Sequence, residues 1–188
     1  TANYILSEME KEQKSFDIVL KEAQNKGFAE ADPSFDIEGM DAAHKIGILS
    51  SIAIGTSLPP NDFYVEGIKD IDSTDFKYAS KLGFSIKHLA VASLTENEVQ
   101  LRAHPVLVSS DSYLAGLKGV RNGIEVETDL VGTLHVAGSG AGQESTASGL
   151  ISDLVYLSNV SSNSSINLNK RIKMNIQPID EMEFKYFF

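Results

Sequence analysis

An uncharged run from Ile46 to Asn61 limits most strongly what this chain can fold into. The run is shorter than the roughly 18 apolar residues that indicate a membrane-spanning helix, so it has to be buried in a protein core. The first part of the run, 46–54, belongs to a segment, 38–54, that reads as a helix. The helix stop signals Gly55 and Pro59-Pro60 lie in the rest of the run. The sequence therefore predicts a helix over 38–54 that is buried along much of its length.

The order of the predicted elements indicates the fold class. Helices are expected first, then strands, then a last helix, which is not the βαβαβ alternation of a nucleotide-binding half. The order favours an α+β fold with a mixed, mostly antiparallel sheet and helices packed on one face. Helices are predicted over 3–26, 38–54, 73–82 and 142–158, at most two helical turns over 112–117, a loop over 28–37, and strands over 65–68, 84–94, 99–108, 124–127 and 131–136.

Two turn predictions accompany these strands. Residues 95–97 read as a hairpin connection between the strands 84–94 and 99–108. Thr128-Asp129 and Asn122-Gly123 compete for the turn of a second hairpin.

Composition excludes several classes of function. The 188 residues include 16 Lys and Arg against 26 Asp and Glu, a net charge of −10, which disfavours a nucleic-acid partner. Cysteine is absent, so there is no disulfide, thiolate nucleophile or cysteine-ligated zinc. The four histidines show no metal-binding spacing, and no metal site is expected. No signal peptide or membrane span is predicted, and one main domain is expected at this length.

A carboxylate and a lysine share one face of the predicted 38–54 helix. Asp41 and Lys45 are four residues apart, and at about 100° per residue Ile48 and Ile52 fall in the same sector. We therefore expect the pair to lie on an apolar stripe, with a partly desolvated lysine beside a fixed carboxylate. Such an ammonium can hand a proton to an oxygen or polarise a carbonyl. The alternative is an exposed ion pair that contributes about 0.3–0.5 kcal/mol.

Further acidic residues precede this pair. Glu30 and Asp36 lie in a loop that Pro33 stiffens, so several carboxylates surround one cation. The surplus of negative charge suits a substrate with its own ammonium group, such as a small amino-bearing carbonyl or alcohol. The alternative is a solvated loop that caps the helix through Asp36 or Glu38.

A glycine-rich segment, GSGAG at 138–142, precedes the last predicted helix. Its spacing lacks the third glycine of the dinucleotide fingerprint GxGxxG, and no strand–helix–strand unit follows it. A glycine turn into a helix N-terminus can still meet an anion or a ribose edge. The alternative is a tight strand-to-helix turn.

The segment 30–45, EADPSFDIEGMDAAHK, closely resembles the signature of homoserine dehydrogenases, whose pattern runs roughly A-E-x-D-P-x-x-D-x-x-G-x-D-x-x-x-K. Further blocks across nearly the whole chain resemble the same family: TANYIL at 1–6, FDIVLKEAQNKG at 16–27, EGI at 66–68, IKHLA at 86–90, HP at 104–105, and GAG at 140–142 followed by TAS at 146–148. Such a long signature is highly specific.

The resemblance implies a cytoplasmic oxidoreductase that interconverts L-homoserine and L-aspartate 4-semialdehyde with NADP or NAD, in the biosynthesis of threonine, methionine and isoleucine. It implies that Lys45 exchanges the proton at the carbonyl oxygen and that Asp41 orients this lysine. Phe28 stands where the family commonly has Tyr. The residues implied to bind substrate are Glu30, Asp36, Phe28 and Thr1, the last through its backbone, and those implied to lie near the cofactor are Gly140 and Gly142.

The resemblance also implies a domain organisation. Residues 1–158 would form the catalytic and dimerisation domain, similar to the C-terminal domain of glyceraldehyde-3-phosphate dehydrogenase. The Ser- and Asn-rich residues 159–170 would be a linker, and 171–188 the start of an ACT regulatory domain. The family's Rossmann domain, which binds most of the cofactor, is absent, so we expect a homodimeric fragment of a longer protein that is inactive alone. The alternative is a non-catalytic dimerisation or amino-acid-sensing module with the same fold.

Overall fold

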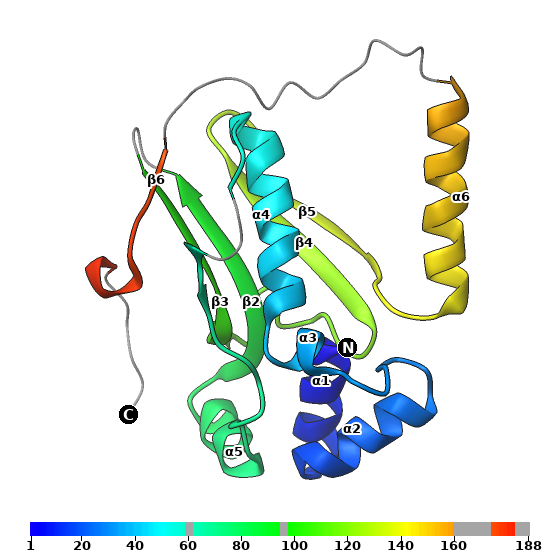
Figure 1. Cartoon of the computed structure of the whole chain (residues 1–188). Helices are drawn as coiled ribbons and strands as arrows, with labels where there is room; N and C mark the ends of the chain where they lie inside the picture. Colours follow the sequence, from blue (N-terminus) through cyan, green and yellow to red (C-terminus); the bar gives the residue numbers. More distant parts are fainter. Residues whose placement is uncertain (59–61, 95–97, 160–173, 183–188) are drawn as a thin grey trace. The chain divides into compact units, whose positions relative to one another are not determined.

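The computed structural model describes residues 1–58, 62–94, 98–159 and 174–182, and the chain divides into two compact units (Figure 1). The first unit comprises 1–34, 69–87 and 106–161, and the second comprises 35–68, 88–105 and 162–188. Strands β2 (Phe84–Leu94) and β3 (Glu98–Ser109) belong in part to each unit. Within the described ranges, no helix has the length and apolar character needed to cross a membrane.

The sheet of the second unit is built around β3. Strand β2 pairs with β3 on one side, while β1 (Tyr64–Val65) and β6 (Asn175–Ile176) also pair with β3, both in parallel. The registers are Tyr64 with Arg102 and Glu98 with Asn175. After β6, the backbone N–H of Gln177 donates to Val99 O at 3.0 Å, and the short helix η2 (Ile179–Glu181) follows.

Helix α4 (Met40–Ile54) packs on this sheet through small side chains. The buried residues of the helix are Ala43, Gly47, Ser50 and Ser51. A Cβ on Gly47 would lie only 3.1 Å from the ring of Phe63, so the missing side chain permits the close approach. The core around this contact consists of Ala43, Leu58, Phe63, Val99, Leu101 and Ala103.

The predicted limits of α4 are confirmed at its C-terminus, where Gly55 adopts a left-handed conformation with φ 79°. The prediction that the helix is buried along much of its length is wrong for Ile48, Leu49 and Ile52, which are 60%, 42% and 48% exposed. Ile46 and Ile54 are half-buried and pack against the core. Because small residues form the face that meets the sheet, the other three large aliphatic residues are left outside it.

The first unit begins with two helices where the sequence predicts one. Helix α1 (Ala2–Glu12) ends at Gln13, which is left-handed with φ 51°, and α2 (Phe16–Asn25) begins after its N-cap Ser15. Gly27, with φ 72°, follows α2. The two helices pack together through Ile5, Leu6, Met9, Val19 and Ala23, all nearly inaccessible to solvent.

Helix α5 (Ser73–Lys81) follows the sequence prediction closely. Its N-cap is Asp72, whose carboxylate accepts hydrogen bonds from the backbone N–H groups of Thr74 and Asp75 at 2.6 and 3.2 Å. The side chain of Asp75 in turn accepts from the backbone of Asp72, which completes a capping box.

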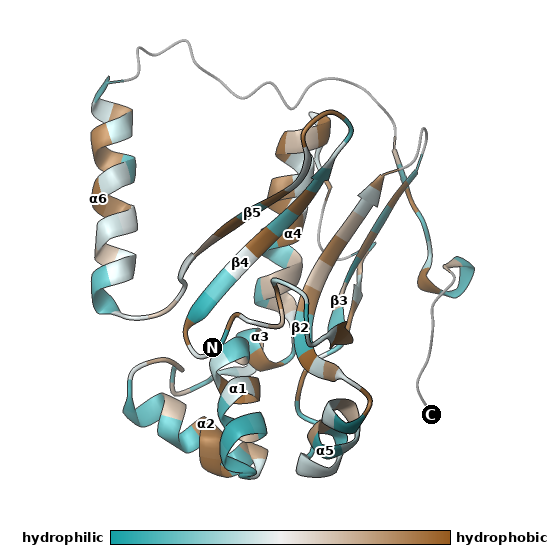
Figure 2. Cartoon of the chain, turned by 180° about the vertical axis from the view of Figure 1, so that it is seen from behind, coloured by the Kyte–Doolittle hydropathy of each residue, from teal (hydrophilic) through white to brown (hydrophobic). Residues whose placement is uncertain are grey.

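The first unit ends with a hairpin and a long helix. Strands β4 (Arg121–Thr128) and β5 (Gly132–Ser139) are antiparallel, so the turn begins at Thr128-Asp129, and Asn122-Gly123 lies inside a strand. Helix α6 (Gln143–Asn159) buries no residue. Apolar side chains alternate with polar ones along both features (Figure 2).

The coarse prediction of a fold that combines β-sheets with helices is confirmed, but the described strands form two sheets and not one. Residues 112–117 form turns without a helix, and the predicted 28–37 loop contains the short helix α3 (Ser34–Ile37). The predicted hairpin connection at 95–97 and most of the predicted linker, 160–170, lie outside the described residues.

Candidate active site

The predicted catalytic pair forms a direct contact. Lys45 Nζ donates a hydrogen bond to Asp41 Oδ2 at 2.6 Å, one helical turn apart on α4. Asp41 lies in the first turn of the helix, where the helix dipole stabilises a carboxylate. The pair therefore presents an ammonium of fixed direction near the N-terminal end of α4.

The expected desolvation of this lysine is not found. The Lys45 side chain is 65% exposed and that of Asp41 34% exposed, because both project from the face of α4 that points away from the sheet. As a contribution to stability the pair therefore resembles an ordinary surface ion pair. Burial therefore does not support a desolvated lysine at this position, and the catalytic role of the pair stays a prediction.

Close backbone packing fixes the start of α4. Its N-cap, Gly39, has φ 90° and makes no side-chain cap, and a Cβ there would lie 3.0 Å from His88 Nε2 and 3.1 Å from Glu66 O. A Cβ on Gly67 would lie 2.4 Å from Ile37 O, and the N–H of Ile68 donates to that same oxygen at 2.9 Å. The segments 37–39 and 66–68 are thus in contact through their main chains.

His88, on β2, lies against both of these main-chain segments. Its Nε2 lies 2.8 Å from Glu66 O, and because a carbonyl only accepts, the ring donates from this nitrogen. Burial lowers the pKa of His88 below its ordinary value, although the hydrogen bond to Glu66 O acts in the opposite direction, so that the neutral imidazole is favoured. Sequence reasoning did not identify His88 as a site residue; a histidine within an apolar strand was the available signal.

The residues predicted to bind substrate fall in both units. Thr1 and Phe28 are together in the first unit, where Thr1 Oγ1 donates to Phe28 O at 2.7 Å and the Phe28 ring packs edge-on against Tyr4. Glu30 follows in the same unit, and its carbonyl accepts from Gln24. Asp36, half-buried in α3, belongs to the second unit with Asp41 and Lys45. The roles of these residues stay predictions.

A buried lysine that sequence reasoning missed lies in the first unit. Lys87 on β2 is 5% exposed and donates to Asn3 Oδ1 at 3.2 Å and to Leu117 O at 2.5 Å. Burial lowers the pKa of Lys87 to about 8, and the nearby cation Lys118 lowers it further while Glu10 opposes this. The Asn3 amide also donates to the carbonyl oxygens of Leu117, Gly119 and Arg121, which ties the start of α1 to the entry into β4.

The two glycines predicted to lie near the cofactor enter α6. A Cβ on Gly140 would lie 1.9 Å from Asn122 Nδ2, the end of an exposed side chain that would have to move aside. Gly142 has φ 113°, and its carbonyl accepts from Ser145 Oγ and Thr146 Oγ1 at 2.9 and 3.0 Å. Both positions fit a tight strand-to-helix turn, and their part in cofactor binding stays a prediction.

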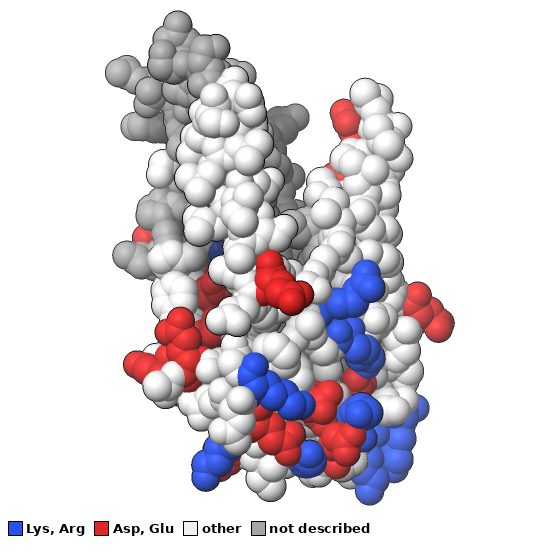
Figure 3. Space-filling view, turned by 90° about the vertical axis from the view of Figure 1, so that its right-hand side faces the viewer, with Lys and Arg blue, Asp and Glu red and all other residues white. Residues whose placement is uncertain are grey.

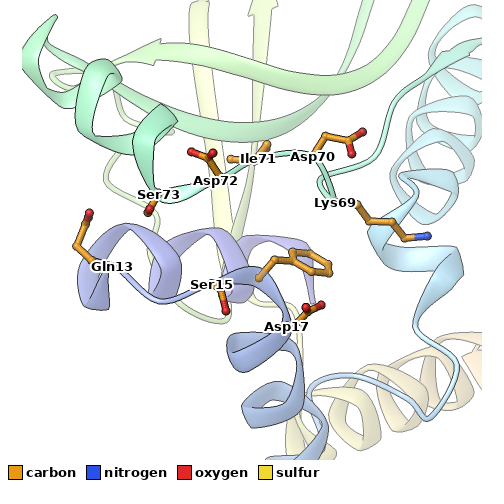
Figure 4. A pocket seen from close by; sticks show the side chains of 9 residues that line it. Gln13, Ser15, Asp17, Lys69, Asp70, Ile71, Asp72 and Ser73 are labelled. Carbon is orange, nitrogen blue, oxygen red and sulfur yellow. The ribbon is translucent and has the colours of Figure 1, made fainter.

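A separate shallow pocket of about 450 Å³ lies between the α1–α2 turn and residues 69–73 (Figure 4). Its charged lining consists of Asp17, Lys69, Asp70 and Asp72. None of the predicted site residues lines it. In the face shown in Figure 3, acidic and basic side chains are interspersed in the lower part of the view. Within the described ranges, no group of three His, Asp or Glu side chains could hold a metal ion.

Comparison with known proteins identifies the family. The sequence model of homoserine dehydrogenase matches residues 1–155. The chain belongs to the homoserine dehydrogenase family. The homoserine dehydrogenase of Pseudomonas aeruginosa is 51% identical over 155 residues, which are 82% of this chain and 36% of that protein.

Other homoserine dehydrogenases match at similar length. That of Helicobacter pylori is 40% identical over 187 residues, covering 100% of this chain and 44% of that protein. The crystal structure of a homoserine dehydrogenase from Thiobacillus denitrificans matches with a TM-score of 0.81 at 41% identity, covering 94% of this chain and 42% of that one. The chain thus spans less than half the length of these homoserine dehydrogenases.

Proposed function

We propose that this chain is the substrate-binding and catalytic part of an enzyme that interconverts L-homoserine and L-aspartate 4-semialdehyde with NADP or NAD. The observation that carries the proposal is the Lys45–Asp41 contact at 2.6 Å, made by two residues of the signature segment inside the region that matches the family. The match of residues 1–155 to the homoserine dehydrogenase family favours catalysis over a non-catalytic module with the same fold.

In this mechanism Lys45 handles the proton. Its ammonium donates to the carbonyl oxygen of the aldehyde during reduction and recovers the proton from the hydroxyl during oxidation. Asp41 keeps the ammonium directed and charged through the 2.6 Å hydrogen bond. A bound nicotinamide would supply or accept the hydride.

Substrate recognition is assigned to the four residues that the family resemblance implies. We propose that Glu30 and Asp36 bind the substrate ammonium, while Thr1 contributes its backbone and Phe28 an apolar wall. A dipolar amino acid would bring the positive charge that these carboxylates favour. The prediction of an amino-acid substrate from the acidic loop supports the same assignment.

The chain's own residues do not form a complete dinucleotide site. The glycines at 140 and 142 fit a tight strand-to-helix turn, and the spacing lacks the third glycine of the fingerprint. We therefore assign most of the cofactor contacts to the part of the enzyme outside this chain, and we expect the chain alone to lack turnover.

The uncovered apolar surfaces support further parts of the proposal. Ile48 and Ile52 are exposed on the same face of α4 as Lys45, so we infer that another part of the complete enzyme covers this face. We also propose a cytoplasmic homodimer and a domain similar to the C-terminal domain of glyceraldehyde-3-phosphate dehydrogenase. Residues 159–170 would be a linker, and 171–188 would lead into an ACT regulatory domain.

The test uses the full-length enzyme and homoserine-dependent NADPH or NADH formation. Lys45→Ala is expected to lower kcat by roughly 10²–10⁴-fold, the usual contribution of a positioned acid–base group. Lys77→Ala, which removes an exposed lysine on α5, is the matched control and should leave kcat unchanged. A Lys45→Ala enzyme with normal kcat would instead support the non-catalytic alternative.

A further inference from the structure

The N-cap of α4 is Gly39, which has no side chain with which to cap the helix. The groups that pack against this glycine therefore contribute to fixing the direction of the first turn. Three groups lie there: His88 Nε2 and Val65 Cγ1, each 3.0 Å from the place a Cβ would take, and Glu66 O at 3.1 Å. Asp41 follows only two residues later.

Two of these groups are joined to each other. His88 Nε2 donates to Glu66 O at 2.8 Å, so the imidazole both contacts the cap glycine and holds the carbonyl beside it. The segment after Glu66 is pressed against the segment before Gly39, because Ile68 N donates to Ile37 O at 2.9 Å and Gly67 admits no side chain. His88 is the side chain that connects this double main-chain contact to the sheet.

From this arrangement we infer that His88 is a positioning residue for the reaction, which acts by fixing the N-terminal end of α4 and hence the direction of the Asp41–Lys45 pair. His88 is not a catalytic residue, since its contacts are with Glu66 and Gly39 and not with the reacting groups. The inference rests on the proposed function of the pair. A displacement of about 1 Å at a catalytic group can lower the rate about 10²-fold, so a loosened helix end is expected to reduce turnover.

Neutral imidazole suits this role. A charged ring would bring a second cation towards the helix N-terminus, where the dipole disfavours positive charge. The half-buried position of His88 disfavours the charged form, which keeps the ring as a simple hydrogen-bond donor.

The experiment compares substitutions of His88 in the full-length enzyme. His88→Leu removes the hydrogen bond while keeping a side chain of similar bulk, and it is expected to lower kcat by about 10- to 100-fold with less than a threefold change in KM for homoserine. His88→Gln can still reach Glu66 O and should restore kcat to within about threefold of the wild type. His135→Leu, on the hairpin of the first unit, serves as the control for loss of a histidine.

A purely structural role gives a different pattern. The unfolding free energy would fall, but kcat per folded molecule would stay within twofold of the wild type in His88→Leu, and this result would overturn the inference. If His88→Leu does not fold, the comparison of His88→Gln with His88→Asn tests the inference. The Asn amide is one methylene too short to reach Glu66 O, so kcat should be lower in His88→Asn than in His88→Gln. Equal kcat values for these two variants would likewise overturn the inference.

Lys45→Ala is assayed in parallel. If Lys45→Ala keeps normal kcat, the proposed function itself fails. If Lys45→Ala is inactive while His88→Leu is fully active, only the role of His88 fails.

Discussion

Lys87 and Asn3 are 84 positions apart in the sequence, yet the Lys87 ammonium donates to the Asn3 amide oxygen at 3.2 Å inside the first unit. The second partner of the ammonium, Leu117 O, is also uncharged. The lysine is therefore buried with dipoles as its partners, while Glu10 and Lys118 act on it only from a distance.

This burial predicts a pH-dependent stability. The folded-state pKa of Lys87 is about 8, below the ordinary value near 10.4, so between these pH values the folded state binds fewer protons than the unfolded state. The free energy of unfolding should therefore rise as the pH increases through this window. Urea unfolding of the chain at pH 7, 8, 9 and 10 measures this rise.

Lys87→Met should flatten the rise, since the titrating group is removed. Lys77→Met, at an exposed position on α5, should keep it. If the free energy of unfolding rose equally with pH in the wild type and in Lys87→Met, groups other than Lys87 would cause the pH dependence.

Asp41→Asn separates catalysis from stability. The exposed pair contributes about 0.3–0.5 kcal/mol, so the unfolding free energy should change by no more than about 0.5 kcal/mol. The kcat of the full-length enzyme should fall at least tenfold, because Lys45 loses the anion that directs it. Steady-state kinetics and chemical denaturation measure the two effects. A large loss of stability with unchanged kcat would reverse the assignment.

Gly67→Ala should destabilise the second unit. The new Cβ would lie 2.4 Å from Ile37 O and 2.8 Å from Glu38 Cα, and main-chain atoms cannot rotate away as a flexible side chain can. We expect a loss of about 1–3 kcal/mol or more in unfolding free energy. Gly149→Ala in α6 is the control, because no atom lies within 4 Å of the new Cβ and alanine favours helix by up to about 1 kcal/mol. Equal stabilities for the two variants would mean that the contact at Gly67 relaxes without cost.

One face of the β4–β5 hairpin is the surface through which we expect the proposed dimer to form. On one face, Ile124 pairs with Val136 and Val126 with Leu134, and these four side chains are 43–65% exposed. The opposite face is polar and includes the hydrogen bond between His135 Nε2 and Glu125 Oε2 at 2.8 Å. An exposed apolar sheet face of this kind is typical of an interface.

Val136→Lys should therefore shift the chain from dimer to monomer in sedimentation equilibrium. Thr133→Lys places the same charge on the polar face of the same strand and should leave the dimer intact. Monomeric wild-type chain, or equal behaviour of the two variants, would exclude this face as the dimer contact.

The sequence by itself determined the local features. The end of α4 at Gly55 and the one-turn spacing of Asp41 and Lys45 follow from φ preferences and 3.6-residue periodicity, both of which act within a few residues. The family signature could be recognised for the same reason, since it is a continuous segment. The break at Gln13 was missed because an αL glutamine carries no local signal comparable to glycine.

Tertiary structure alone decided which face of α4 is buried and what surrounds its first turn. Periodicity indicated an apolar stripe, but the sheet accepts the face with Ala43 and Gly47 because small residues allow the closest approach, and Lys45 is left on the exposed side. The contact of His88 with Glu66 and Gly39 joins three separate segments of the chain, so no local pattern could predict it.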